Sequence, residues 1–342
     1  WMKADTRLMK QLNKSTLRNI LSQKRTATKP ELAKYSGLSV VTVNALLSEM
    51  LYSGEVQESG NAPSGGGRPS MQYSYNYDYR TVAVVYGHQL EGRSYIHTLA
   101  VNLDGKKLWE RQEYMEEIGP ESFDSVLDEV FAAFGNTGLI AFGLPGEAIG
   151  NEVIINDFKG LEGRVFLPRI RERYQVPVLF ENDINAMTYG YYQSKCVEGE
   201  ACVAGIYFPR SFFPGAGLVL NGSIYYGASH FAGEMGAMYT PVPWDKLDYF
   251  DGEQVLHQLE EVLVSYSCIA APSRFVLYGD FFTADMSRLL EQRVGSRLGG
   301  SFRVRVETSE KLEEDYETGM ISLALKRIVE DMDALQDREV KL

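Results

Sequence analysis

The sequence predicts an α/β protein in which a small helical module precedes a larger body. Two patterns lead to this fold class. Apolar residues recur at helical spacing through the first 50 positions, and from about residue 81 short β-rich runs alternate with helical patterns. With 342 residues, the chain is long enough for two or three domains, each with its own core.

The module begins with a predicted amphipathic helix over residues 5–23, followed by the sequence of a capping box. In such a box Thr28 accepts a backbone N–H of the next helix, and Glu31 reaches back to the backbone before it. We expect a short helix over residues 31–35, ended by Gly37 in a left-handed conformation.

A third predicted helix, from its cap at Ser39 to about Leu51, completes a helix-turn-helix. Short polar and methyl-bearing side chains face outward near its start. They suit base edges in the major groove, because Asn can bond adenine and a Thr or Ala methyl group can touch that of thymine. The predicted DNA contacts of this helix are Ser39, Val40, Thr42, Asn44 and Ala45. A three-helix packing module with a polar outer face is the alternative.

Residues 55–79 predict a β-hairpin, which after a helix-turn-helix would be a wing. Its tip reads Gly-Gly-Gly-Arg-Pro-Ser, and its second strand places Met71 and every second residue to Tyr79 on one face. Glycines let the backbone approach DNA closely, and arginine enters narrow minor grooves. We therefore add Gly67 and Arg68 to the predicted DNA contacts. A flexible linker would have a similar composition.

Charge is divided unevenly along the chain. Residues 1–80 carry 11 Lys or Arg and 6 Asp or Glu, whereas the remaining residues carry 23 and 40. An acidic protein with a basic head can still bind nucleic acid through that head. Neither a membrane-spanning run nor a signal-peptide pattern is present, which predicts a cytoplasmic protein without a membrane partner. The three cysteines, Cys196, Cys202 and Cys268, lack C-x-x-C spacing and favour ordinary thiols over a zinc site.

In the body, strands and helices are predicted in alternation. The strands are expected at residues 82–86, 94–102, 107–112, 139–144, 176–180, 201–208, 217–220 and 274–278, and the helices at 121–134, 164–174, 184–192, 254–267 and 320–335. The polar run Glu181-Asn182-Asp183 follows one of these strands. Ligands bind at that edge of open α/β sheets, and the same residues can also cap the helix that follows.

At these residues the chain resembles the ROK family, a group of repressors, open reading frames and sugar kinases. The motifs are, in order, GGGRPS at the wing, FGLPG at 142–146, Asn156 with GLEG at 160–163, ENDINAMTYG at 181–190, GAGLVLNGSIYYG at 215–227 and FAGEMG at 231–236. The resemblance implies a two-lobed actin-like body (ribonuclease H-like, as in sugar kinases and Hsp70) with a sugar cleft between the lobes. The expected domains are residues 1–79 for the winged helix-turn-helix, 80–184 with 322–342 for the smaller lobe, and 185–321 for a larger lobe with an oligomerisation surface.

The resemblance also implies four sugar contacts. The matching positions are Asn156, Asn182, Asp183 and Glu234. Carboxylates and amides at these positions can bond the hydroxyls of a sugar, and a polar group left unpaired would reject the wrong ligand. In the family's kinases, the aspartate that matches Asp183 is the general base.

The sequence departs from the kinases where they hold ATP. The Asp-x-Gly-Gly-Thr loop is replaced by residues 86–92, which lack that pattern. Rings and prolines occupy the second phosphate loop, 208–214, and a third loop at 278–280 lacks its run of glycines. Because phosphoryl transfer depends on positioning the phosphates, we expect catalysis to be lost. Ala237 stands where the family's zinc histidine is expected, so no metal or other cofactor is predicted.

Together these observations predict a ligand-responsive transcriptional regulator of the repressor type. It would bind operator DNA through its head as a homodimer or tetramer, and sense a carbohydrate or sugar phosphate in its cleft. Two alternatives remain open: an active sugar kinase that uses Asp183 as its base, and a constitutive DNA-binding protein with a vestigial cleft.

Overall fold

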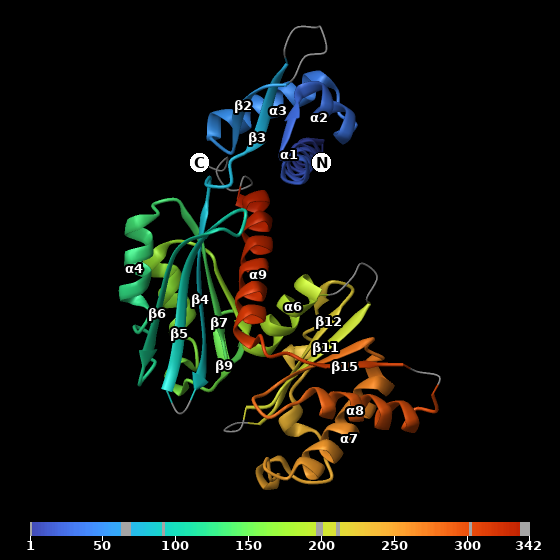
Figure 1. The fold of residues 1–342 in the computed structure, drawn as a ribbon. Helices are drawn as coiled ribbons and strands as arrows, with labels where there is room; N and C mark the ends of the chain where they lie inside the picture. The colour runs from blue at the N-terminus through green and yellow to red at the C-terminus, as the bar shows by residue number, and fades with distance from the viewer. Residues whose placement is uncertain are drawn as a thin grey trace.

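A computed structural model describes residues 2–62, 70–90, 93–195, 201–209, 213–300 and 303–335 of the chain. Figure 1 shows three parts in succession: a head with the N-terminal helices, a first lobe beside it, and a second lobe at the far end. Each lobe contains a five-stranded sheet covered by helices, which confirms the predicted α/β body. No helix in the described part of the chain is long and apolar enough to cross a membrane.

Local sequence signals set the helices of the head. Its elements are α1 (Met2–Lys24), β1 (Thr26–Thr28), α2 (Lys29–Ser36), α3 (Val40–Ser53), β2 (Val56–Asn61) and β3 (Met71–Tyr75). The predicted capping box is present, with hydrogen bonds in both directions between Thr28 and Glu31. Gly37 follows α2 at φ 71°, a conformation that glycine adopts without a Cβ clash. Ser39 caps α3 by accepting a hydrogen bond from the backbone of Thr42.

A single core holds these helices against an antiparallel sheet of order β1-β3-β2. The predicted core face of α3 is confirmed, since Val43, Leu46, Leu47 and Met50 are all buried. The predicted alternation of tyrosines to residue 79 is wrong, because β3 ends at Tyr75 and a turn follows. The wing tip, with Gly67 and Arg68, lies outside the described residues.

One ion pair of the head is buried. Arg18 of α1 donates from Nε to Oε1 of Glu55 over 2.6 Å, and the two side chains are 4% and 2% exposed. Glu55 directly precedes β2, so this pair joins the first helix to the hairpin.

The first lobe has a sheet of order β10-β7-β4-β5-β6. Its elements are β4 (Thr81–Leu90), β5 (Arg93–Asn102), β6 (Lys107–Met115), α4 (Asp124–Ala133), β7 (Thr137–Leu144), β8 (Gly146–Ile149), β9 (Glu152–Asn156), η1 (Lys159–Leu161), α5 (Phe166–Tyr174) and β10 (Val178–Asn182). Helices α4 and α5 cover one face and bury their apolar residues against it. Strands β10, β7 and β4 are parallel neighbours, so their carboxyl ends meet at one edge.

The second lobe has a sheet of order β13-β12-β11-β14-β15. Its elements are β11 (Cys202–Tyr207), β12 (Gly215–Leu220), β13 (Ser223–Ile224), η2 (Ala228–His230), η3 (Met235–Ala237), η4 (Trp244–Lys246), α7 (Gly252–Ala270), β14 (Arg274–Tyr278), α8 (Ala284–Arg297) and β15 (Arg305–Thr308). Helices α7 and α8 cover its outer face.

Two helices, α6 (Asp183–Lys195) and α9 (Leu312–Leu335), pack between the two sheets. Their crossing is very close at two glycines. A Cβ atom added to Gly190 of α6 would lie 1.8 Å from the carbonyl oxygen of Asp315, and one added to Gly319 of α9 would lie 1.9 Å from that of Ala186. Helix α9 begins eight residues before the predicted start, and its first turn therefore reaches the space between the lobes.

A turn of the first lobe joins the body to the head. Leu103, between β5 and β6, packs against both the head core and the core around α9. Its neighbour Asp104 forms an ion pair with Arg25 of the head, with 2.8 Å between Nη1 and Oδ1. On the other side of the turn, the side chains of Ile321 and Leu325 of α9 lie 3.5 Å from a Cβ built on Gly105. The turn is thus in contact with the head and with α9.

Candidate functional site

A cavity of about 1070 Å³ lies between the lobes, where the carboxyl edge of the first sheet faces the second lobe. The ends of β7, β10 and β11, the first turns of α6 and α9, and the segment 232–236 all contribute to its wall. Its polar side chains are those of His88, Glu147, Asp157, Asn182, Asp183, Asn185, Tyr207, Glu234, Asp280, Ser309, Glu310 and Glu313.

Three of the four predicted sugar contacts line this cavity together. They are Asn182 at the end of β10, Asp183 at the start of α6, and Glu234 before η3. The fourth, Asn156, is the last residue of β9 and pairs with Gly146 at the cavity wall, but its side chain lies outside the described residues. The structure thus brings together residues from both lobes that are 51 and 52 positions apart in sequence.

Asn182 and Asp183 also organise the start of α6, as the capping interpretation predicts. The Asn182 oxygen accepts from the backbone of Asn185 over 3.2 Å, while its amide donates to the carbonyl of Gly146 over 3.1 Å. One carboxylate oxygen of Asp183 accepts from the backbone of Ile184 over 2.8 Å. These bonds fix both side chains before any ligand arrives, which lowers the entropy that binding must overcome.

Buried carboxyl groups crowd the cavity wall around the end of β10. Burial, reinforced by the nearby charges of Glu181, Glu234 and Asp183, raises the pKa of Glu147 to about 8. Burial likewise raises the pKa of Glu181 and that of Asp183 to about 7. A protonated carboxyl group can donate a hydrogen bond to a hydroxyl group and an ionised one can accept, so Glu147 and Asp183, which line the cavity, can serve in either way.

Two contacts join the lobes beside this wall. Tyr226 of the second lobe donates to Glu181 of the first over 2.6 Å, and Nδ1 of His230 lies 3.2 Å from Oε2 of Glu147. The rings of Tyr226 and His230 stack with their centroids 4.7 Å apart. His230 has a left-handed backbone at φ 57°, a conformation that non-glycine residues adopt only when their surroundings hold them there.

Sequence reasoning missed several of these residues. Glu147 and His230 were not predicted to lie at the cleft, and Tyr226, although it lies in the motif at 215–227, was not predicted to contact Glu181, because only the tertiary fold brings these segments together. Glu181 was part of the polar run, yet its role differs from that of its neighbours. It accepts from Tyr226, from Asn185 and from the backbone of Asn182 and is only 3% exposed, so it braces the wall.

The raised pKa of Glu147 makes a prediction about stability. Its carboxyl group costs nothing below its ordinary pKa of 4.5, destabilises the fold increasingly as pH rises toward about 8, and costs most above that value. Glu147→Gln should therefore raise the unfolding free energy at pH 8.5 by at least about 1.4 kcal/mol, the equivalent of one pKa unit, and much less at pH 4.5. Denaturant titrations at both pH values measure this. Glu172→Gln, at an exposed position of α5, is the control, and an equal effect at both pH values would contradict the assignment.

At the opposite end of the cavity, the described residues do not form a phosphate loop. Strand β4 continues without a break through Gly87, His88 and Gln89, which pair with β5. A Cβ on Gly87 would lie 2.4 Å from a methyl group of Ile96. The Ile96 side chain can therefore pack against β4 only because residue 87 has no side chain. Phe208 and Phe282 meet edge to face across the second and third loops, with centroids 5.7 Å apart.

On the head, the outward face of α3 differs in part from the prediction. Val40, Asn44 and Ala45 are exposed as expected. Thr42 is half-buried, and its hydroxyl oxygen lies 2.9 Å from that of Ser39, the N-cap residue. Both side chains thus take part in the hydrogen bonding at the start of the helix. The Asn44 oxygen accepts from Lys29 of α2 over 2.5 Å. The most exposed apolar side chains of the helix, Val41 at 80% and Tyr52 at 96%, were not predicted as contacts.

Known proteins resemble the chain in sequence. The sequence model of the ROK family matches residues 91–255. A protein of Caldicellulosiruptor sp. (strain Rt8B.4), named as a candidate xylose repressor, is 32% identical over 244 residues, which cover 68% of this chain and 59% of the relative. The xylose repressor of Bacillus spizizenii (strain W23) is 26% identical over 247 residues, covering 69% of this chain and 62% of the relative. The matches thus cover less than two thirds of either relative.

Solved structures share the fold. A ROK family transcriptional regulator, described as a homologue of the E. coli MLC protein, superposes with a TM-score of 0.64 and 15% identity, covering 96% of this chain and all of that one. The ROK hexokinase of Thermus thermophilus gives a TM-score of 0.53 and 18% identity over 72% of this chain and 99% of the hexokinase. At these identities the likeness shows the fold alone.

Proposed function

The chain carries a ROK family domain, and from this premise we propose that it is a transcriptional repressor that binds operator DNA through its head and senses a carbohydrate in its cleft. One observation carries the proposal: a head with a helix-turn-helix geometry and a three-stranded sheet is joined to a two-lobed body with a cavity between the lobes. Two relatives that match more than two thirds of the chain are named as xylose repressors, which supports the same function.

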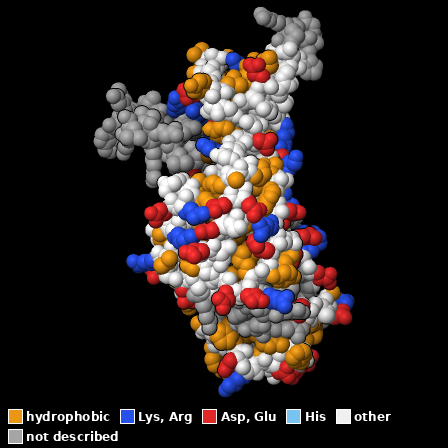
Figure 2. All heavy atoms as spheres, turned by 90° about the vertical axis from the view of Figure 1, so that its left-hand side faces the viewer, with side chains coloured by type: hydrophobic (Ala, Val, Ile, Leu, Met, Phe, Trp, Pro, Cys, Tyr) orange, Lys and Arg blue, Asp and Glu red, His pale blue; other side chains and the backbone are white. Residues whose placement is uncertain are grey.

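In this proposal α3 is the recognition helix. It follows α2 across a turn at Gly37, and its exposed face presents Val40, Asn44 and Ala45 to the major groove. The wing, with Gly67 and Arg68, would contact the minor groove beside it. Figure 2 shows acidic and basic side chains interspersed over the middle of one face of the molecule, so that face offers no continuous basic surface for DNA.

Substitutions in the head should separate affinity from specificity. With an operator selected from a random DNA library, Asn44→Ala should cost about 1–3 kcal/mol of discrimination at a single base pair. Arg68→Ala should weaken binding to all sequences to a similar degree and make it less dependent on salt. Fluorescence anisotropy at several salt concentrations measures both. Asn19→Ala, exposed on α1, is the control, and unchanged binding in both test variants would refute the assigned contacts.

The body would bind its sugar against Asn182, Asp183 and Glu234, which line the cavity together. We expect the cleft to bind the sugar without phosphorylating it. The uninterrupted pairing of β4 with β5 and the packed rings at the second loop support this expectation, since phosphoryl transfer requires backbone groups that face the phosphates. The division of the body at residues 184 and 321 also remains a prediction, and α9 packs against elements of both lobes.

A sugar that serves as the effector should change operator affinity by about tenfold or more, equivalent to about 1.4 kcal/mol of coupling. Anisotropy with a panel of pentoses and hexoses measures this, and Asp183→Asn, which keeps the size of the side chain, should abolish the response. Sugar-dependent ATP consumption by the pure protein, lost in the same variant, would establish the kinase alternative. Operator binding that no sugar alters would favour the constitutive DNA-binding protein.

A further inference from the structure

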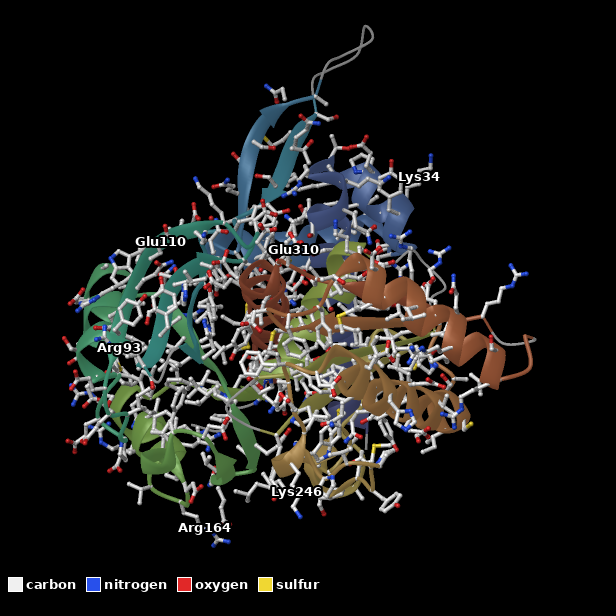
Figure 3. The ribbon with its side chains drawn as sticks, turned by 60° about the horizontal axis from the view of Figure 1, so that its bottom comes forward. Lys34, Arg93, Glu110, Arg164, Lys246 and Glu310 are labelled. Atoms are coloured by element: carbon white, nitrogen blue, oxygen red, sulfur yellow. The ribbon has the colours of Figure 1, made fainter. Side chains whose placement is uncertain are left out.

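The cavity has an unusual balance of charge. Seven carboxyl side chains line it: Glu147, Asp157, Asp183, Glu234, Asp280, Glu310 and Glu313. No lysine or arginine is among its described lining residues, although residues 210–212 beside Pro209 lie outside the description. In Figure 3 Glu310 lies between the lobes, whereas the labelled basic side chains Lys34, Arg93, Arg164 and Lys246 lie toward the outside. A phosphate group entering this cavity would meet carboxyl groups and no described cationic side chain that could neutralise it.

Groups that can accept hydrogen bonds line one end of the cavity. His88 lies there, with Nε2 4.0 Å from Oε1 of Glu313 in the first turn of α9. The imidazole is 9% exposed, its Nδ1 has no hydrogen-bond partner, and burial lowers its pKa. A neutral imidazole has one nitrogen that accepts, and Nε2, the nitrogen on the side of Glu313, can accept from a donor held beside that carboxylate. Lys311 is not that donor, because its ammonium forms an ion pair with Glu314 and lies outside the lining.

Aromatic rings also line the cavity. Tyr207, Phe208, Phe213 and Phe282 line the cavity, and Phe213 is 59% exposed. Carboxylates combined with aromatic faces are the surroundings in which proteins bind ammonium groups, because both the charge and the ring quadrupole attract a cation. A metal ion is a poorer candidate, since no group of three or more His, Cys, Asp or Glu among the described residues is arranged to hold one.

We propose that the ligand of this cleft is a polyol that bears a protonated amine, with the ammonium group at the end formed by His88, Glu310 and Glu313. The inference rests on the proposed function, in which the cleft binds a carbohydrate. The hydroxyl groups would meet Asn182, Asp183 and Glu234, while the amine would donate to the carboxylates and to the imidazole. The same carboxylates would repel a phosphorylated sugar. The cleft would therefore bind amine-bearing sugars more tightly than neutral or anionic ones.

Matched sugars test this inference on the full chain. Isothermal titration calorimetry at about pH 6.5, where an aliphatic amine is protonated, compares glucose, glucosamine, N-acetylglucosamine and glucose 6-phosphate, and repeats the comparison for mannose and galactose. In at least one series the amino sugar should bind about fivefold or more tightly than its neutral and acetylated counterparts, and the phosphate should bind most weakly. The preference should shrink as salt rises, because part of the site is open to solvent.

A double variant tests the position of the amine. Glu310→Gln with Glu313→Gln should reduce the preference for the amino sugar about fivefold and leave the affinity for the neutral sugar unchanged. Glu116→Gln with Glu117→Gln removes the same charge from exposed positions outside the cavity and is the matched control. Thermal melting of each variant establishes that it is folded.

The outcomes separate this inference from the proposed function. Neutral sugars that bind as tightly as amino sugars would overturn the inference and leave carbohydrate sensing intact, as would tighter binding of the phosphate. A preference for amino sugars that survives the double variant would contradict the assignment of the ammonium group to this end of the cleft. If no sugar of any series binds, the carbohydrate proposal itself fails.

Discussion

Gly190→Ala is expected to destabilise the protein by about 3 kcal/mol or more, and Gly319→Ala by a similar amount. The methyl group would lie 1.8 Å from the carbonyl oxygen of Asp315 in the first case and 1.9 Å from that of Ala186 in the second. Both obstacles are backbone atoms of a facing helix, which cannot rotate away as a side chain can. The two helices would have to separate between the sheets, and overpacking of that kind is costly.

Urea unfolding followed by circular dichroism measures this loss. Gly295→Ala in α8 is the matched control, because no atom lies within 4 Å of the added methyl group. In that open helical position alanine should stabilise the protein by about 0.5–1 kcal/mol. A Gly190→Ala variant as stable as the parent would show that the two helices do not cross as closely as described.

Arg18→Met should destabilise the head by about 3–5 kcal/mol. The substitution removes one partner of a buried ion pair and leaves the carboxylate of Glu55, whose side chain is 2% exposed, without its charge partner. Because a chain with several domains need not unfold in a single step, a local measurement is required. Hydrogen exchange of the amides in α1, α3 and β3 should speed up strongly, while that of the body sheets stays unchanged.

Two further variants identify the cause. The double substitution Arg18→Met with Glu55→Met should recover much of the lost protection, since two apolar side chains of suitable size often replace a buried pair at little cost. Lys10→Met, which breaks an ion pair with Glu49 whose side chains are 50% and 43% exposed, should cost less than about 1 kcal/mol. A double variant as unstable as the single one would assign the loss to packing alone.

Local signals allowed much of the fold to be predicted. The capping box at Thr28, the left-handed Gly37 and the cap at Ser39 depend on residues within a few positions, and all three are present. Short or weakly periodic elements were missed. Strand β1 has only three residues and exists because β3 pairs with it. The first turn of α9 carries Glu313, Glu314 and Asp315, which favour a helix start, but apolar periodicity marked the helix only from residue 320.

The candidate site was predicted in part from one strand end and in part from the family motifs. Asn182 and Asp183 stand together at a strand end, so their place at the cavity could be inferred from that position, whereas Glu234 was predicted only through the resemblance. The contacts of Glu147 with His230 and of Glu181 with Tyr226 join segments 83 and 45 residues apart. Such contacts depend on how the lobes face one another, which no local pattern encodes. The acidic lining of the cavity could not be predicted for the same reason, because its carboxylates come from at least five segments.

The close crossing at Gly190 and Gly319 lies near the middle of the stretch of α9 that reaches from the cavity to the turn beside the head. From this crossing to Leu312 at the cavity the helix is about 10 Å long, and from it to Leu325 beside Gly105 about 9 Å, at about 1.5 Å per residue. Any tilt of α9 about the crossing would therefore move these two points by similar distances in opposite directions. Such a tilt, if a ligand caused it at the cavity, would reach the turn that carries Leu103, which packs against the head core.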